Sequence, residues 1–194
     1  MKILLISAGT KRKGATARAV AEIEKVLTKN DFEYGKFDLF TESISACCGC
    51  DVCRKGMPCI HNDKASDLAN ICSAYDGYIF FTPVHFGGAS GTLKSALGRV
   101  FYQAKKSLAF KPAATVAVSR RSGNVTALEE INRFFTFNNM PIVTGNYPAI
   151  IYGTSFEEVD NDQEGLQTLR SLAENMIWIL KTIEYGKKGG IFHP

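Results

Sequence analysis

Short apolar segments alternate with amphipathic segments along this 194-residue chain, and that alternation constrains the fold more than any other feature. The first segment, residues 2–8, is almost continuously apolar, which is typical of a parallel strand covered on both faces. Similar segments predict further strands at residues 34–40, 77–82, 113–119 and 142–151. Apolar residues that recur every three or four positions predict helices near residues 16–29, 63–72, 93–104, 124–137 and 166–180.

Strands that alternate with helices predict an α/β fold with a parallel sheet, because right-handed crossovers place helices on both faces. Five strands favour the order 2-1-3-4-5 over a dinucleotide-binding order. We expect one domain over residues 1–194, with a cysteine-rich loop at residues 45–61. Sheets of this kind bind ligands beyond the carboxyl ends of their strands, so the loops after the first, third and fourth strands are the candidate site.

Charge and hydropathy exclude several classes of protein. The net charge of +4 is mild and the basic residues are scattered, which argues against nucleic-acid binding. The N-terminal apolar run, Ile3 to Ile6, is too short for a signal peptide or a membrane span, so we expect a cytoplasmic protein that does not bind membranes. A reducing compartment keeps cysteines free for metal, cluster or redox chemistry.

The loop after the first predicted strand favours a phosphate group. It combines hydroxyl, glycine and basic residues just before a helix, whose N-terminal amides and dipole attract anions. The alternative is an ordinary turn in which Thr16 caps the helix. The candidate binding residues are Ser7, Thr10, Lys11, Arg12, Gly14, Ala15 and Thr16.

Two nucleotide motifs are incomplete in this loop. The segment from Gly9 to Thr16 departs from the P-loop pattern at Ala15, where a lysine would reach the phosphates of ATP or GTP. The Gly-x-Gly-x-x-Gly fingerprint is also missing, which argues against permanently bound NAD. A monophosphate is the better fit.

The loops after the third and fourth strands supply the rest of the candidate site. Glycines in the first of them let the backbone approach a flat ligand, and the second adds cationic and amide donors. The alternative for the loop after the third strand is a flexible connection, and the alternative for the loop after the fourth strand is that its basic residues are merely solvated. The candidates are Pro83, Val84, His85, Phe86, Gly87 and Gly88, followed by Ser119, Arg120, Arg121, Gly123 and Asn124. A phosphate site, a planar pocket and polar donors together match FMN.

The cysteine-rich loop predicts a metal or redox site. Cys47-x2-Cys50-x2-Cys53-x5-Cys59 resembles the compact spacing that holds a 4Fe–4S cluster. Structural zinc, with His61 as a further ligand, is less favoured because two separated Cys-x-x-Cys pairs are missing. Free or reversibly oxidised thiols are the other alternative. Cys72 lies on an apolar helix face, where a buried structural thiol is expected.

These motifs together resemble the NADPH-dependent FMN reductase and iron-sulfur flavoprotein group of the flavodoxin-like superfamily. The matching stretches are Ser7 to Thr16, Cys47 to Cys53, Thr82 to Gly88, Ser90 to Lys94, and the tail from Asp162 to Gln167. The resemblance implies a flavodoxin-like three-layer sandwich with a five-stranded parallel sheet. It also implies that the first loop surrounds the FMN phosphate, that residues 83–88 lie along the flavin, and that residues 119–124 close the pocket.

The resemblance has further implications and two departures. It implies that Cys47, Cys50, Cys53 and Cys59 hold a 4Fe–4S cluster, and that the chain assembles as a homodimer or homotetramer. His85 stands where relatives often have tyrosine, and Gly98 where they often have aspartate. Phe134, Phe135 and Phe137 provide apolar surface for assembly or belong to a buried helix.

The sequence favours an enzyme in which FMN accepts electrons from NAD(P)H and passes them to a small-molecule acceptor. The alternative is an electron carrier that receives electrons from a ferredoxin-like partner through a 4Fe–4S cluster. A binding protein with an empty site is the third hypothesis. No catalytic triad is expected because the flavin carries the chemistry. His85 is interpreted as a packing residue, with proton donation to the flavin as the alternative.

Overall fold

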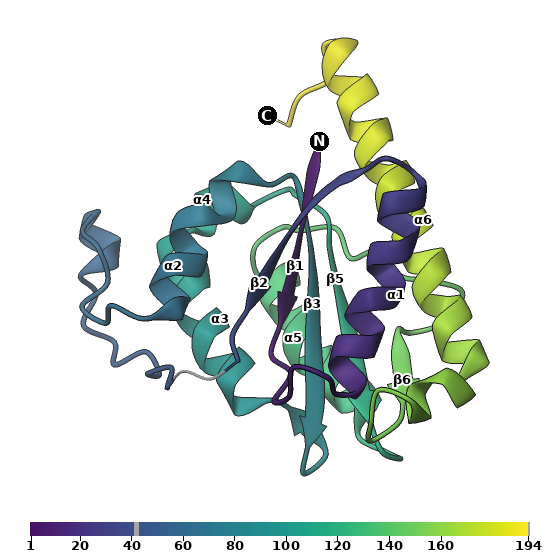
Figure 1. Cartoon of the computed structure of the whole chain (residues 1–194). Helices are drawn as coiled ribbons and strands as arrows, with labels where there is room; N and C mark the ends of the chain where they lie inside the picture. Colours follow the sequence, from purple (N-terminus) through teal and green to yellow (C-terminus); the bar gives the residue numbers. More distant parts are fainter. Residues whose placement is uncertain (41–42, 194) are drawn as a thin grey trace.

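The computed structural model describes residues 1–40 and 43–193 (Figure 1). The strands are β1 (Lys2–Ser7), β2 (Glu33–Asp38), β3 (Gly77–His85), β4 (Gly88–Ala89), β5 (Ala113–Ser119) and β6 (Ile150–Tyr152). The α-helices are α1 (Ala15–Lys29), α2 (Lys64–Ile71), α3 (Gly91–Gln103), α4 (Lys105–Leu108), α5 (Asn124–Thr136) and α6 (Gln163–Lys188). Three short 3-10 helices are η1 (Cys53–Lys55), η2 (Cys72–Ala74) and η3 (Glu158–Asn161).

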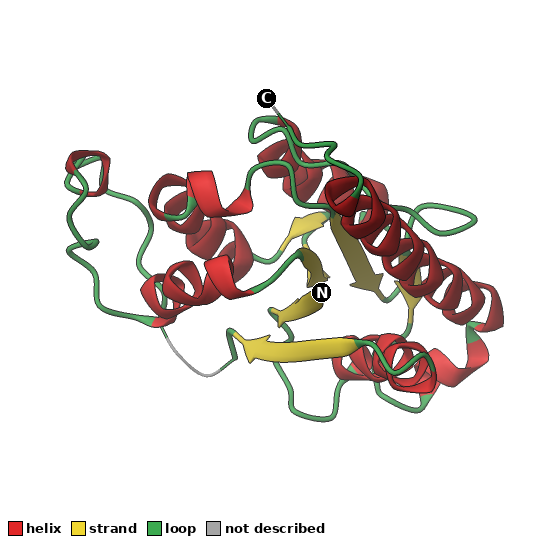
Figure 2. Cartoon of the chain, turned by 90° about the horizontal axis from the view of Figure 1, so that it is seen from above, coloured by secondary structure: helices red, strands yellow, loops and turns green. Residues whose placement is uncertain are grey.

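The sheet confirms the predicted parallel α/β fold. Its strand order is β2-β1-β3-β5-β6, and each neighbouring pair along this path is parallel. The two-residue β4, which was not predicted, pairs antiparallel with β3, so the sheet has six strands rather than five. Helices lie on both sides of the sheet (Figures 1 and 2).

The core forms two apolar layers, one on each face of the sheet. Ile3 and Leu5 of β1 point into the layer with α1 and α6, whereas Leu4 and Ile6 point into the layer with α2, α3 and α5. This alternation follows from the two-residue period of a strand. It explains why β1 is apolar at consecutive positions: both of its faces are buried.

Two predicted elements need correction. The last strand was predicted over residues 142–151, but β6 spans only Ile150–Tyr152, and Ile142 makes one isolated bridge to Ala113. Pro148 lies within the predicted strand and lacks an N–H for pairing, which explains the shortening. The third strand was predicted to end before Pro83, but β3 continues to His85.

The helices show how far the phenylalanines of α5 and its C-terminal end are buried, and whether any helix could cross a membrane. Phe135 is buried in the core, Phe134 is partly buried against it, and Phe137 is largely exposed, so the buried-helix interpretation holds for Phe135, in part for Phe134, and not for Phe137. No helix within residues 1–40 and 43–193 has both the length and the apolar character needed to cross a membrane.

A buried charged cluster joins α1 to the C-terminal part of the chain. Glu22 accepts hydrogen bonds from Arg18 at 2.9 Å and from Arg170 at 2.6 Å, and Arg18 Nε donates to Asp160 at 2.7 Å. Arg18 and Glu22 are both buried. Burial would raise the pKa of Glu22, but the hydrogen bonds from Arg170 and Arg18 outweigh it and lower the pKa. Glu22 is therefore held as a carboxylate between two guanidinium groups.

Replacing Glu22 should destabilise the fold in a pH-dependent way. Glu22→Gln removes the carboxylate that pairs with Arg170 and with the buried Arg18, which then has only Asp160 as an ionic partner, so we expect the free energy of unfolding to fall by about 3 kcal/mol at neutral pH. Because the folded pKa lies below the ordinary value of 4.5, this contribution is complete above about pH 4.5 and is lost as the pH falls through the lowered pKa. Urea unfolding at pH 7 and below pH 4 measures the difference. Exposed Glu174→Gln on α6 is the control, and an equal loss in both variants would contradict the prediction.

Candidate functional site

A pocket lies at the carboxyl ends of the parallel strands, where the fold predicts a ligand site. The carboxyl end of β3, the first turn of α1 and the loops after β1, β5 and β6 form its walls. The lining residues are Thr10, Lys11, Gly14, Ala15, Thr16, Pro83, Val84, His85, Val118, Ser119, Arg120, Gly153 and Thr154. The segments predicted to follow the first, third and fourth strands therefore converge as expected, and the loop after β6 adds Gly153 and Thr154, which were not predicted.

The first turn of α1 offers an anion-binding arrangement to this pocket. Gly14 is the N-cap residue, and no side chain in the described part of the chain caps the helix. Thr16 lies inside the helix, so the alternative in which Thr16 caps it is wrong. The amides of a first helical turn have no partner within the helix, and the helix dipole places partial positive charge there. With Lys11 on the pocket wall, this end of the pocket suits a phosphate.

The segment after β3 is a hairpin rather than the long loop that was expected. His85 pairs with Gly88, and the two residues between them, Phe86 and Gly87, have positive φ angles of 47° and 81°. Positive φ at both turn positions is typical of a type I′ turn, which matches the twist of the flanking strands. Phe86 is fully exposed, and Phe86, Gly87 and Gly88 are outside the set of pocket-lining residues.

His85 is exposed at the pocket wall, so its interpretation as a packing residue is wrong. The hairpin ends its strand here, and this brings the imidazole to the rim instead of the core.

Buried polar groups fix the loop after β5. Ser119 Oγ donates to Asn124 Oδ1 at 2.6 Å, and Asn124 Nδ2 donates to the carbonyl oxygens of Ala117 at 3.2 Å and Ile151 at 3.4 Å. The Asn124 side chain thus joins α5 to β5 and β6. Ser119 and Arg120 line the pocket, whereas Arg121, Gly123 and Asn124 are not among the lining residues.

Gly123 connects this loop to the hairpin. Its φ is 88°, and a Cβ atom there would lie 2.6 Å from Gly87 Cα and 2.9 Å from Val84 Cγ1. Only glycine combines this backbone conformation with so close an approach. The loop after β5 therefore passes close to the turn between β3 and β4.

Gly123→Ala should lower the free energy of unfolding by about 2 kcal/mol, because the left-handed conformation and the collision both oppose a methyl group. Gly91→Ala is the matched control, since a Cβ at Gly91 meets nothing within 4 Å in the described structure. Urea unfolding compares the two variants. Equal free energies of unfolding for Gly123→Ala and Gly91→Ala would contradict the prediction, because they would show that the loop after β5 accommodates the methyl group without cost.

Ser7 and Arg12 lie at a neighbouring cleft rather than in this pocket. Lys11 lines both cavities, and the cleft is also bounded by Glu24, Lys36 and Asp38. Ser7 is buried and its Oγ accepts the N–H of Gly9 at 3.2 Å, so it shapes the start of the loop.

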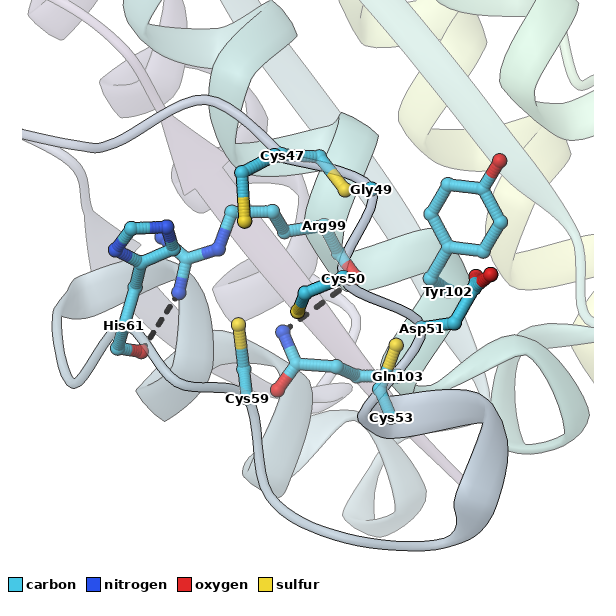
Figure 3. A pocket seen from close by; sticks show the side chains of 11 residues that line it. Cys47, Gly49, Cys50, Asp51, Cys53, Cys59, His61, Arg99, Tyr102 and Gln103 are labelled. Carbon is cyan, nitrogen blue, oxygen red and sulfur yellow. Dashed lines mark hydrogen bonds between the residues drawn. The ribbon is translucent and has the colours of Figure 1, made fainter.

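The cysteine-rich loop forms a second, separate pocket (Figure 3). Cys47, Cys48, Cys50, Cys53 and Cys59 all line it. Within residues 1–40 and 43–193, no three His, Cys, Asp or Glu side chains are already positioned to hold a metal ion. The thiols share one cavity, and ligation of a metal would require the loop to draw them closer.

The sixth cysteine, Cys72, is buried as predicted. Its thiol donates to the carbonyl of Leu68 at 3.1 Å, and burial raises its pKa to about 12. It is a structural thiol in the core.

Arg99 of α3 lies beneath the cysteine pocket and was missed as a functional candidate. Its guanidinium donates to Asp63 Oδ2 at 2.5 Å and to the carbonyl oxygen of His61 at 2.8 Å. Burial would raise the pKa of the Cys59 thiol, but a backbone hydrogen bond from His61 and the nearby Arg99 charge lower it. The sequence signal that could have identified Arg99 is its position as a charged residue among the apolar residues of a predicted helix.

Comparison with known proteins gives consistent matches. Residues 1–155 match the family model described as NADPH-dependent FMN reductase. Two iron-sulfur flavoproteins of Methanocaldococcus jannaschii are similar over nearly the whole chain: one is 27% identical, covering 95% of this chain and 100% of the relative. The other is 30% identical, covering 93% of this chain and 98% of the relative. A solved WrbA-like flavodoxin of Agrobacterium tumefaciens has a similar fold, with a TM-score of 0.65 at 12% identity, covering 93% and 98% of the two chains.

Proposed function

This chain belongs to the NADPH-dependent FMN reductase family and is a flavin-dependent oxidoreductase, and we propose that its FMN lies in the pocket at the carboxyl ends of β1, β3, β5 and β6. The observation that carries this proposal is the uncapped N-terminus of α1, which opens beside Lys11 into that pocket. A helix end without a capping side chain can give its amides to a phosphate. The residues present therefore fit a flavin monophosphate.

Each wall of the pocket has a proposed role. Thr10, Lys11 and the α1 amides would hold the phosphate, and the β3 residues from Pro83 to His85 would lie along the flavin ring, since all of them line this pocket. Ser119 and Arg120 close the opposite side, and Gly153 and Thr154 complete it. Bound FMN supplies the capacity to accept a hydride or single electrons. His85, exposed at the rim, is the group we propose to hold a proton beside the flavin.

We propose that NAD(P)H reduces the flavin and that a small acceptor such as a quinone oxidises it. Protein purified without added flavin should be yellow, and NADPH oxidation beyond the one equivalent that reduces the bound FMN should require both the protein and the acceptor. A colourless protein that binds no added FMN would contradict the proposal. Rapid oxidation of NADPH by flavin-stripped protein would contradict it as well.

A second function, electron transfer through a 4Fe–4S cluster, is supported by the cysteine pocket. Soft thiolates are the ligands that iron-sulfur clusters use, and two relatives are named iron-sulfur flavoproteins. Two polar atoms at this pocket, Arg99 Nε and His61 Nε2, are buried and have no hydrogen-bond partner within the described residues. We propose that Cys47, Cys50, Cys53 and Cys59 hold the cluster and that a ferredoxin-like protein supplies electrons. Iron and sulfide analysis after anaerobic purification tests this, and less than one iron per chain would argue against it.

A further inference from the structure

Arg99 clamps both ends of the cysteine loop. Its side chain is 1% exposed. One terminal nitrogen donates to Asp63 Oδ2 at 2.5 Å and to the Ser45 carbonyl at 3.3 Å. The other donates to the His61 carbonyl at 2.8 Å and to Ser66 Oγ at 2.9 Å. Ser45 precedes the loop's first cysteine and His61 follows its last, so a single guanidinium holds the loop closed against α3.

The fifth N–H of this guanidinium, on Nε, is the one that remains. Arg99 Nε is buried and has no hydrogen-bond partner within the described residues, although the side chain lines the cysteine pocket. Buried donors in native proteins are nearly always paired, and an arginine cannot avoid the cost by losing its proton. Figure 3 shows the Arg99 side chain beside Cys47, Cys50 and Cys59, which line the same pocket, so the pocket can offer sulfur atoms as acceptors for this donor.

We propose that Arg99 is a positioning residue whose Nε–H donates a hydrogen bond to a sulfur atom of a 4Fe–4S cluster held by the loop, and that this contact raises the cluster's reduction potential. The inference rests on the proposed iron-sulfur function. Reduction adds one electron, and part of the added negative charge resides on the sulfur atoms. A fixed positive charge and an N–H donor stabilise that reduced form more than the oxidised form.

Two substitutions separate a hydrogen bond from Arg99 to the cluster from a role in which Arg99 only anchors the cysteine loop. Arg99→Lys keeps the positive charge but removes the Nε–H, whereas Asp63→Asn weakens the same clamp and leaves Arg99 intact. A purely structural role would move the potential in the same direction in both variants. Donation predicts a lower potential for Arg99→Lys. It predicts an unchanged or higher potential for Asp63→Asn, because that variant removes a negative charge.

The experiment uses the intact flavin-containing protein, purified anaerobically and titrated with dithionite while the electron paramagnetic resonance signal of the reduced cluster is followed. In parallel, wild type and two variants labelled with ¹⁵N-arginine are studied by electron-nuclear double resonance, which detects arginine nitrogen close to the cluster. We expect a nitrogen coupling that is lost in Arg99→Lys and kept in Arg54→Lys, a control on η1 within the same loop.

The outcomes distinguish this inference from the proposed function. A wild-type protein without a cluster would overturn both. A cluster that shows no arginine coupling, or whose potential is the same in wild type and Arg99→Lys, would overturn the role of Arg99 and leave the iron-sulfur function standing.

Discussion

Cys50→Ser should remove nearly all iron from anaerobically purified protein, while Cys48→Ser should retain it. Both cysteines are exposed in the same loop and both line the same pocket. Only Cys50 belongs to the regularly spaced set of Cys47, Cys50, Cys53 and Cys59. A serine hydroxyl is a much poorer iron ligand than a thiolate, so losing one of the four should reduce iron from about four atoms per chain to well below one.

Iron and sulfide content, normalised to flavin, measures this effect. The flavin content should be unchanged in both variants, because no residue in the described structure lines both the cysteine pocket and the strand-end pocket. Loss of iron in Cys48→Ser with full retention in Cys50→Ser would show that the ligand set is assigned wrongly. Simultaneous loss of flavin in Cys50→Ser would contradict the independence of the two sites.

Gly14→Asp should weaken FMN binding by about 100-fold, which corresponds to about 3 kcal/mol. Gly14 has an extended backbone with φ of −116°, so aspartate can adopt its conformation. The new carboxylate would cap the α1 amides and repel the phosphate that we place there. Aspartate is also a good N-cap, so the stability of the helix should change by only a few tenths of a kcal/mol.

Gly14→Asn provides the control for the shape of the new side chain. A Cβ atom at residue 14 would lie 3.2 Å from Lys11 Cβ, and both substitutions impose that contact. Asparagine also caps the helix but carries no charge, so its effect on FMN affinity should be much smaller. Riboflavin, which lacks the phosphate, should bind both variants about equally. Equal FMN affinity in Gly14→Asp and Gly14→Asn would contradict phosphate binding at this helix end.

The fold could be predicted well because burial on both sheet faces leaves a strong pattern. Continuous apolar residues in β1 and β5 specify buried parallel strands, and the helices between them require crossover connections. The last strand was less predictable. Its apolar residues extend back to Ile142, but the interruption at Pro148 confines regular pairing to Ile150–Tyr152.

The candidate site was predictable at the level of loops and less so for single residues. The carboxyl ends of β1, β3 and β5 follow from topology, and the same rule could have identified Gly153 and Thr154 after β6. The hairpin at Phe86 and Gly87 was not predicted. Its turn consists of only these two residues, between the paired His85 and Gly88, and the surrounding glycines indicate a loop rather than a strand. Arg99 was not identified because its acceptors are up to 54 positions away in sequence, a distance that no local pattern reports.

Equilibrium titration of the flavin-stripped protein with FMN, followed by flavin fluorescence, tests the central claim most directly. Binding at the strand-end pocket predicts saturation at one FMN per chain and an affinity for riboflavin that is at least about tenfold weaker, because the α1 amides and Lys11 bind only the phosphate. A titration without saturation, or equal affinity for FMN and riboflavin, would contradict the account.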